Sequence, residues 1–186
     1  ERISKATGIP KDEIRMVKNF IFLEKHDLGG SELEYFEPDY MTGRYIEDEA
    51  DRNLAKDIIF DRLYWDRLDA GTIPEEEVIE GIKSRLPERL WESAINAYKN
   101  WIYNIPEIEG MSALVRYVKE VYGVRAFLLS NISVYFAEHA DEIPCLALFE
   151  KCIFSAVCGK VKPSREMFEY LCHECNILPE ETLFID

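Results

Sequence analysis

Polar side chains follow short apolar runs at three places in the C-terminal half of the sequence. Ser130 and Asn131 come directly after one run, Lys160 and Lys162 lie in a loop after a second, and Asp186 follows a third. A hydroxyl, a lysine and a carboxylate together can bind a phosphoryl group, neutralise its charge and hold a hard divalent cation. These residues are therefore the first candidates for a chemical role.

Alternating strands and helices are needed to position these groups. The apolar runs 124–129, 152–157 and 182–185 are typical of short buried strands, and 111–122 and 164–175 have the spacing of helices. This alternation predicts an α/β fold with a parallel sheet. In such a sheet, ligands bind beyond the carboxyl ends of the strands, which is where the polar side chains stand.

The first half of the chain reads mainly as helical. Apolar residues recur at steps of three and four between residues 51 and 103, which predicts three helices. Residues 1–22 predict a short helix opened by Pro10, and turn residues follow at 27–30 and 37–39.

The composition narrows the class of protein. The chain of 186 residues has 36 acidic and 22 basic residues, for a net charge of -14, which argues against a nucleic-acid partner. It has no apolar run near the roughly 20 residues that span a bilayer, and its start does not resemble a signal peptide. We therefore expect no membrane association, a cytoplasmic location and reduced cysteines.

The order and spacing of the polar sites resemble the haloacid dehalogenase-like (HAD) hydrolase superfamily. Leu-Leu-Ser-Asn at 128–131 is similar to its second motif, residues 159–168 to its third and residues 182–186 to the start of its fourth. The resemblance implies an α/β fold, namely a HAD-like Rossmannoid parallel sheet core with a small α-helical cap. It also implies a magnesium-dependent phosphatase that acts on a small phosphorylated metabolite through an aspartyl-phosphate intermediate.

The resemblance also implies roles for individual residues. Ser130 would hydrogen-bond the phosphoryl oxygens, and Asn131 would help to shape the substrate pocket. Lys162, with Lys160 as its rival, would stabilise the charge of the phosphoaspartate. Asp186 would be a ligand of Mg²⁺.

The resemblance extends from about residue 37 to residue 186 and suggests a division of the chain. Residues 41–105 correspond to the helical cap, which closes over the site in such phosphatases, and residues 106–186 to the core. Residues 1–40 form a segment of uncertain role that is also similar to part of the C-terminal domains of bacterial polymorphic toxins. The family normally continues beyond its fourth motif, so we expect a core that is truncated there.

The first motif of the family, which supplies the aspartate nucleophile, is not intact in this sequence. Asp27, in Asp-Leu-Gly-Gly, is the best candidate for the nucleophile and for a second metal ligand, but polar residues 24–26 precede it. Leu23 stands where an aspartate would follow the apolar residues 20–22. Asp61 also follows an apolar run, but its surroundings are helical, so we reject it.

Three other functions remain open from the sequence. The damaged first motif favours a catalytically silent or truncated interaction module. A 2-haloacid dehalogenase shares the Ser-Asn and Lys features but displaces halide without a metal. Cys172 and Cys175, possibly with Cys158, could hold zinc, although the same cysteines lie on one apolar helix face. The oligomeric state is not indicated.

Overall fold

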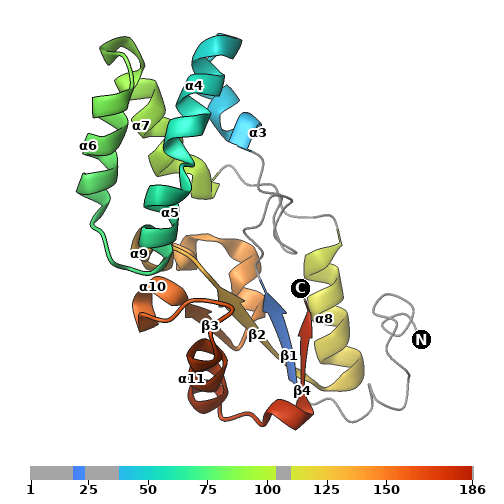
Figure 1. The fold of residues 1–186 in the computed structure, drawn as a ribbon. Helices are drawn as coiled ribbons and strands as arrows, with labels where there is room; N and C mark the ends of the chain where they lie inside the picture. The colour runs from blue at the N-terminus through green and yellow to red at the C-terminus, as the bar shows by residue number, and fades with distance from the viewer. Residues whose placement is uncertain (1–18, 24–37, 104–109, 186) are drawn as a thin grey trace.

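The structure is a computed structural model that describes residues 19–23, 38–103 and 110–185. Its centre is a parallel four-stranded sheet in the order β3-β2-β1-β4 (Figure 1). The strands of this sheet are β1 (Asn19–Leu23), β2 (Arg125–Ser130), β3 (Lys151–Phe154) and β4 (Thr182–Ile185). The α/β fold class and the parallel sheet expected from the sequence are confirmed.

The register of the strands brings their carboxyl ends to one edge. Leu23 of β1 lies opposite Leu129 of β2, and Ser130 lies opposite Phe154 of β3. On the other side of β1, Phe22 lies opposite Ile185. The residues that follow β1, β2 and β4 in sequence therefore all start from the same edge of the sheet.

Helices cover both faces of the sheet. Helix α8 (Met111–Tyr122) packs on the face that carries Ala126 and Leu128, and α11 (Arg165–Cys175) packs on the face that carries Phe127 and Leu129. The alternation of these four residues between two apolar clusters is what a strand buried on both faces requires. Helix α8 ends at Tyr122, as the sequence predicted, and Gly123 follows it with φ at 65°.

A second group of helices lies beyond the carboxyl edge of the sheet (Figure 1). Most of its buried residues form one apolar cluster that includes Ile59, Leu68, Val78 and Ile82. The helices of this group are α3 (Pro38–Gly43), α4 (Glu49–Ile59), α5 (Arg62–Asp69), α6 (Glu75–Arg85), η1 (Glu88–Leu90), α7 (Trp91–Asn100) and η2 (Trp101–Tyr103).

The prediction of three helices between residues 51 and 103 was wrong, because this range holds four α-helices. The break that the periodicity missed lies at Asp61, whose carboxylate accepts a hydrogen bond from the Leu63 N–H and caps a new helix, α5. Its role as a helix cap agrees with the rejection of Asp61 as a nucleophile.

Two further expectations were wrong. Residues 19–23 form a strand instead of the end of a helix, because β2 and β4 pair with them on both sides. The strand expected at 152–157 ends at Phe154, and the chain turns at Ser155 into the short helix α10 (Ser155–Cys158). The remaining short elements are α9 (Val134–Glu138), η3 (Ala140–Glu142), η4 (Pro144–Leu148) and η5 (Pro179–Glu181).

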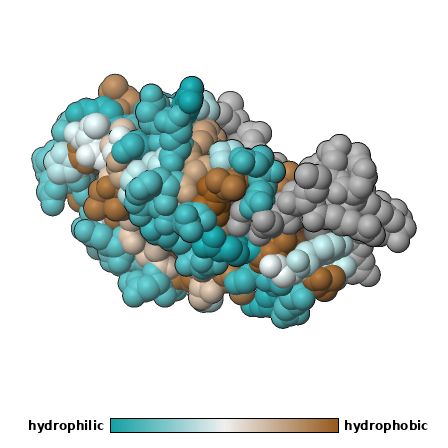
Figure 2. All heavy atoms as spheres, turned by 90° about the horizontal axis from the view of Figure 1, so that it is seen from below, coloured by the Kyte–Doolittle hydropathy of each residue, from teal (hydrophilic) through white to brown (hydrophobic). Residues whose placement is uncertain are grey.

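Apolar residues on the surface do not gather in one large area on the face that Figure 2 shows. That face is mainly hydrophilic, with separate hydrophobic spots between hydrophilic residues. In the parts of the chain that the structure describes, no helix has both the length and the apolar character needed to cross a membrane.

Candidate functional site

Ser130 is the last residue of β2 and is completely buried. It stands at the carboxyl edge of the sheet, beside the strand β1 that ends at Leu23. Strand β2 positions this hydroxyl because it is held between β1 and β3 and packed on both faces. The structure thus places Ser130 where a parallel sheet binds its ligands.

The side chain of Asn131 holds the backbone of Lys162. The Lys162 N–H donates a hydrogen bond to Asn131 Oδ1 at 2.7 Å, and Asn131 Nδ2 donates one to the Lys162 carbonyl oxygen at 3.1 Å. The oxygen and the nitrogen of the Asn131 amide therefore both bond to the backbone of one residue in the loop before α11. This contact joins the second-motif and third-motif segments at the sheet edge, and Lys162 is half-buried there.

The rival lysine, Lys160, is engaged elsewhere. Its ammonium donates a hydrogen bond to the Cys158 carbonyl oxygen at 3.2 Å and lies 4.8 Å from the centre of the Tyr170 ring. Tyr170 belongs to α11, so the cation is drawn toward the outer helix. The Lys160 ammonium therefore lies toward the outer helix, whereas the Lys162 backbone is bonded to Asn131 at the sheet edge.

The start of α11 holds the end of the Lys162 loop. The Ser164 hydroxyl accepts a hydrogen bond from the Met167 N–H at 3.3 Å and caps the helix. Met167 is fully buried under the sheet, which fixes the first turn of α11. The loop that carries Lys162 is thus tied to the structure at both its middle and its end.

Sequence reasoning missed Ser155, which connects the two groups of elements. Its fully buried hydroxyl donates a hydrogen bond to the Asp69 carbonyl oxygen of α5 at 2.5 Å and accepts one from the Ile132 N–H at 2.8 Å. Ile132 follows Ser130 and Asn131 in the same segment. The signal was present, because Ser155 is a polar residue within an apolar run at a strand end, as Ser130 is.

A close backbone contact lies beside Ser155. Gly71 has φ at 66°, and a Cβ atom built on it would lie 2.6 Å from the carbonyl oxygen of Ala156. Only glycine therefore fits this approach of the α5–α6 connection to α10 without a shift of the backbone.

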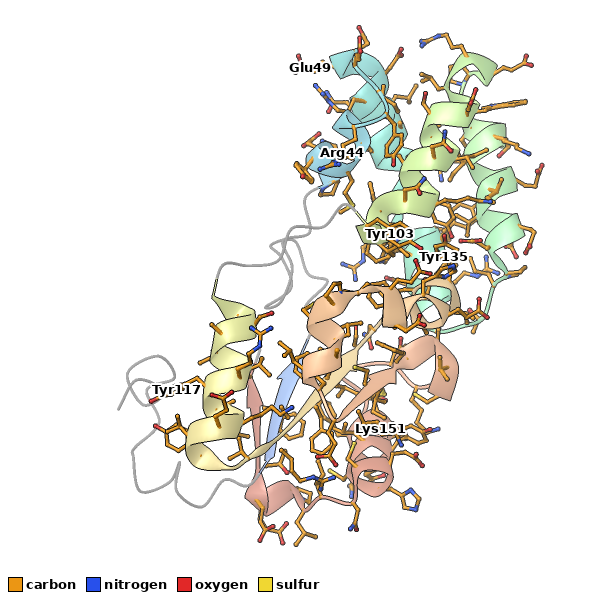
Figure 3. All side chains as sticks on the ribbon, turned by 180° about the vertical axis from the view of Figure 1, so that it is seen from behind. Arg44, Glu49, Tyr103, Tyr117, Tyr135 and Lys151 are labelled. Carbon is orange, nitrogen blue, oxygen red and sulfur yellow. The ribbon has the colours of Figure 1, made fainter. Side chains whose placement is uncertain are left out.

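A small pocket lies where the helical group meets the sheet, and Glu75, Tyr98 and Tyr135 are among the residues that line it. One carboxyl oxygen of Glu75 is buried and has no hydrogen-bond partner among the described residues. Burial raises the pKa of the Glu75 carboxyl above its usual range. Tyr135 lies beside Tyr103 at this junction (Figure 3), and the Tyr103 hydroxyl donates a hydrogen bond to Glu142 at 3.1 Å.

Two of the predicted site residues, Asp27 and Asp186, lie outside the described residues. Strand β1 ends at Leu23, four residues before Asp27, and β4 ends at Ile185, directly before Asp186. Within the described part of the chain, no three His, Cys, Asp or Glu side chains come together in a way that could hold a metal ion.

The cysteines considered for zinc contribute to the apolar core. Cys175 is buried in the cluster that also holds Met167 and Leu171, and the half-buried Cys172 packs against it. Burial raises the pKa of the Cys175 thiol to about 11, which disfavours the thiolate that zinc requires. These contacts support the apolar-face interpretation of the two cysteines.

The sequence agrees with one protein family over most of its length. The family model of the haloacid dehalogenase-like hydrolases matches residues 23–186. The chain therefore belongs to this hydrolase family, as the motifs indicated. No curated protein matches the chain in sequence.

Solved structures agree in fold at low sequence identity. The HAD family enzyme bt-2542 from Bacteroides thetaiotaomicron is 20% identical, with a TM-score of 0.66 over 91% of this chain and 84% of that one. A predicted HAD-like family hydrolase from Porphyromonas gingivalis is 24% identical, with a TM-score of 0.57 over 92% of this chain and 82% of that one.

A dehalogenase has a similar fold. The L-2-haloacid dehalogenase from Xanthobacter autotrophicus, with chloropropionic acid covalently bound, is 14% identical, with a TM-score of 0.57 over 90% of this chain and 69% of that one. The bt-2542 enzyme has also been solved in complex with magnesium and inorganic phosphate. At such low identities these neighbours show the fold of this chain, and its reaction has to be inferred from its own residues.

Proposed function

We propose that the chain is a magnesium-dependent phosphatase that acts on a small phosphorylated metabolite through an aspartyl-phosphate intermediate. The observation that carries this proposal is the double hydrogen bond between Asn131 and Lys162, which brings the Ser-Asn and lysine motifs together at the carboxyl edge of the sheet. We take residues 41–105 as the cap, and β1 together with residues 106–186 as the core.

The proposed reaction has two steps. In the first step the Asp27 carboxylate attacks phosphorus, an acyl phosphate forms on Asp27, and the bond to the leaving oxygen breaks, so that the leaving group departs and takes up a proton from solvent. In the second step a water molecule attacks that phosphorus and gives up a proton, which frees the Asp27 carboxylate and inorganic phosphate. Ser130 donates a hydrogen bond to a phosphoryl oxygen, and Lys162 balances the negative charge of the transferred group. Each group acts on the phosphoryl oxygens, where charge develops during transfer.

Asp27 and Asp186 are the residues that would hold Mg²⁺. Carboxylate oxygens are the ligands that Mg²⁺ takes in proteins. In sequence, Asp27 comes after β1 and Asp186 after β4, and these two strands end at the same edge of the sheet. When bound, the cation would neutralise phosphoryl charge.

The composition supports a small substrate in a reducing compartment. The net charge of -14 disfavours polyanionic partners such as nucleic acid. No two cysteines of the described residues form a disulfide with each other, and we propose a cytoplasmic location. The helices beyond the carboxyl edge would form the wall that selects the substrate.

The decisive experiment is hydrolysis of an aryl phosphate by this chain, with magnesium and then with a chelator. We expect magnesium-dependent turnover that falls at least about 10³-fold in Asp27→Asn, because the nucleophile is lost. Glu24→Gln is the matched control, since Glu24 directly follows β1 and is the other acid close to the first motif in sequence. Loss in Glu24→Gln with retention in Asp27→Asn would move the nucleophile to Glu24.

The dehalogenase fold neighbours justify one alternative assay. Chloride release from 2-chloropropionate by the same preparation, in the presence of a chelator, would assign dehalogenation instead. No turnover in either assay, from a chain with a cooperative unfolding transition, would leave the catalytically silent HAD-like module.

A further inference from the structure

We propose that Asn131 is the positioning residue that sets the Lys162 ammonium relative to the Ser130 hydroxyl. This inference rests on the proposed phosphatase function, because it assigns a partner to the lysine of that reaction. Asn131 acts through the backbone of Lys162 and does not itself touch the phosphoryl group.

The geometry of the amide carries this proposal. Asn131 Oδ1 accepts from the Lys162 N–H at 2.7 Å, and Nδ2 donates to the Lys162 carbonyl at 3.1 Å, so a rigid planar group grips a residue at two points. A single hydrogen bond would let the Lys162 backbone pivot about it. Two bonds from one plane fix both the distance of the backbone and its rotation, and hence the direction in which the side chain leaves.

The backbone of Asn131 is itself held firmly in place. Asn131 follows Ser130, which is buried at the end of β2, and precedes Ile132, which is buried and bonded through its N–H to the Ser155 hydroxyl. The position of the Asn131 amide is therefore fixed relative to the sheet. On the Lys162 side, the Gly159 N–H donates a hydrogen bond to the Ser155 carbonyl oxygen at 2.8 Å, and this bond holds the start of the Lys162 loop.

Asn131 and Lys162 are 31 residues apart in sequence, and their contact aligns two segments that the proposed reaction needs together. A hydroxyl on a rigid strand and an ammonium on a loop have to meet the same phosphoryl group. A misplacement of about 1 Å in such a group costs about 10²-fold in rate. The Asn131 amide is the contact that brings the loop to the strand with this precision.

Two substitutions separate this role from a direct one. Asn131→Ala removes both hydrogen bonds, and we expect kcat to fall about 10²-fold with KM changed less than about threefold. Asn131→Asp keeps an acceptor for the Lys162 N–H, but it replaces the donor with a carboxylate oxygen that faces the Lys162 carbonyl oxygen. One of the two hydrogen bonds remains, so we expect kcat to lie between that of Asn131→Ala and the wild type.

The rank order of the two variants is the test. A residue that contacted the phosphoryl group directly would give the opposite order, because the added carboxylate would repel the substrate and make Asn131→Asp worse than Asn131→Ala. That order would overturn the proposal. Asn100→Ala is the matched control, since the Asn100 amide bonds to the Asn96 carbonyl within its own helix, and we expect wild-type kinetics from it.

A second measurement does not depend on activity. Hydrogen exchange of the Lys162 amide, followed by NMR, should be slow in the wild type and in Asn131→Asp and at least about tenfold faster in Asn131→Ala, with the fold of each variant verified by its exchange pattern in β2. Fast exchange in the wild type, or slow exchange in all three, would overturn the proposal whatever the kinetics. Absent turnover with the expected exchange pattern would reject the phosphatase function alone and leave Asn131 as the residue that fixes the Lys162 backbone.

Discussion

At the scale of the residue, the carboxyl group of Glu75 has an energetic cost in the folded protein. It lies at the first position of α6, where a negative charge suits the helix, yet one of its oxygens is buried and without a hydrogen-bond partner among the described residues. Burial outweighs the attraction of the Lys99 charge and the hydrogen bond with Tyr98, and so the pKa of Glu75 is raised.

This raised pKa predicts a pH-dependent stability. The folded state binds the Glu75 proton more tightly than the unfolded state, so its contribution to stability is fully present below the usual pKa of a glutamate and is lost as the pH rises through the folded value. Glu75→Gln should therefore raise the free energy of unfolding by about 1 kcal/mol at pH 8 and change it little at pH 4.

Urea unfolding of Glu75→Gln at a series of pH values would test this expectation. Glu76→Gln, at the next and exposed position, removes the same charge without the buried oxygen and serves as control. A stability difference for Glu75→Gln that is the same at every pH would show that burial of the charge is not its cause.

At the scale of the element, Gly71 lies close to α10, where the helical group meets the elements that follow the sheet. Gly71→Ala places a methyl group against the Ala156 carbonyl and adds a side chain at φ of 66°. We expect a loss of about 2–4 kcal/mol, which combines the backbone strain with the steric clash, and a fall in Tm of roughly 4–16 °C.

Gly123→Ala is the control that separates the two causes of this loss. Gly123 has almost the same φ, 65°, but a Cβ atom there would meet nothing within 4 Å. It should lose only about 1 kcal/mol, the cost of the left-handed backbone. Equal losses in the two variants, measured by thermal unfolding, would mean that the contact with Ala156 adds nothing.

At the scale of the whole molecule, an aromatic stack joins the helical group to the sheet. Trp101 lies 5.4 Å from Trp65 of α5 and 5.7 Å from Phe136 of α9, measured between ring centres, and Ile132 packs in the same cluster. The cluster is buried and takes residues from both groups, which favours unfolding as a single cooperative unit.

Removal of this stack should uncouple the two groups. In Trp101→Ala we expect a loss of about 3–5 kcal/mol and separate denaturant midpoints for hydrogen exchange in α6 and β2, whereas we expect a single midpoint in the wild type. Trp91→Ala is the control, because Trp91 packs within the helical cluster and bonds to the Leu86 carbonyl. Coincident midpoints in Trp101→Ala would show that the stack does not couple the groups.

The sequence by itself determined the elements whose periodicity is strong and local. Helices α8 and α11 and strands β2 and β4 lie where the sequence predicted them, because a strand period of two or a helix period near 3.6 is visible in neighbouring residues. The Ser-Asn and lysine motifs lie at the end of β2 and in the loop before α11. The family followed from the order of those motifs, and the family model confirms it.

Only the tertiary structure decided which segments meet. The segment 19–23 is too short for its sequence to distinguish a helix turn from a strand. Its pairing with β2 and β4, more than 100 residues away, makes it an inner strand of the sheet. Likewise, the hydrogen bonds from Ser155 to Asp69 and between Asn131 and Lys162 join residues that are far apart in the chain. Local patterns specify periodicity, whereas hydrogen bonds between distant segments form only when packing of the apolar faces has brought those segments together.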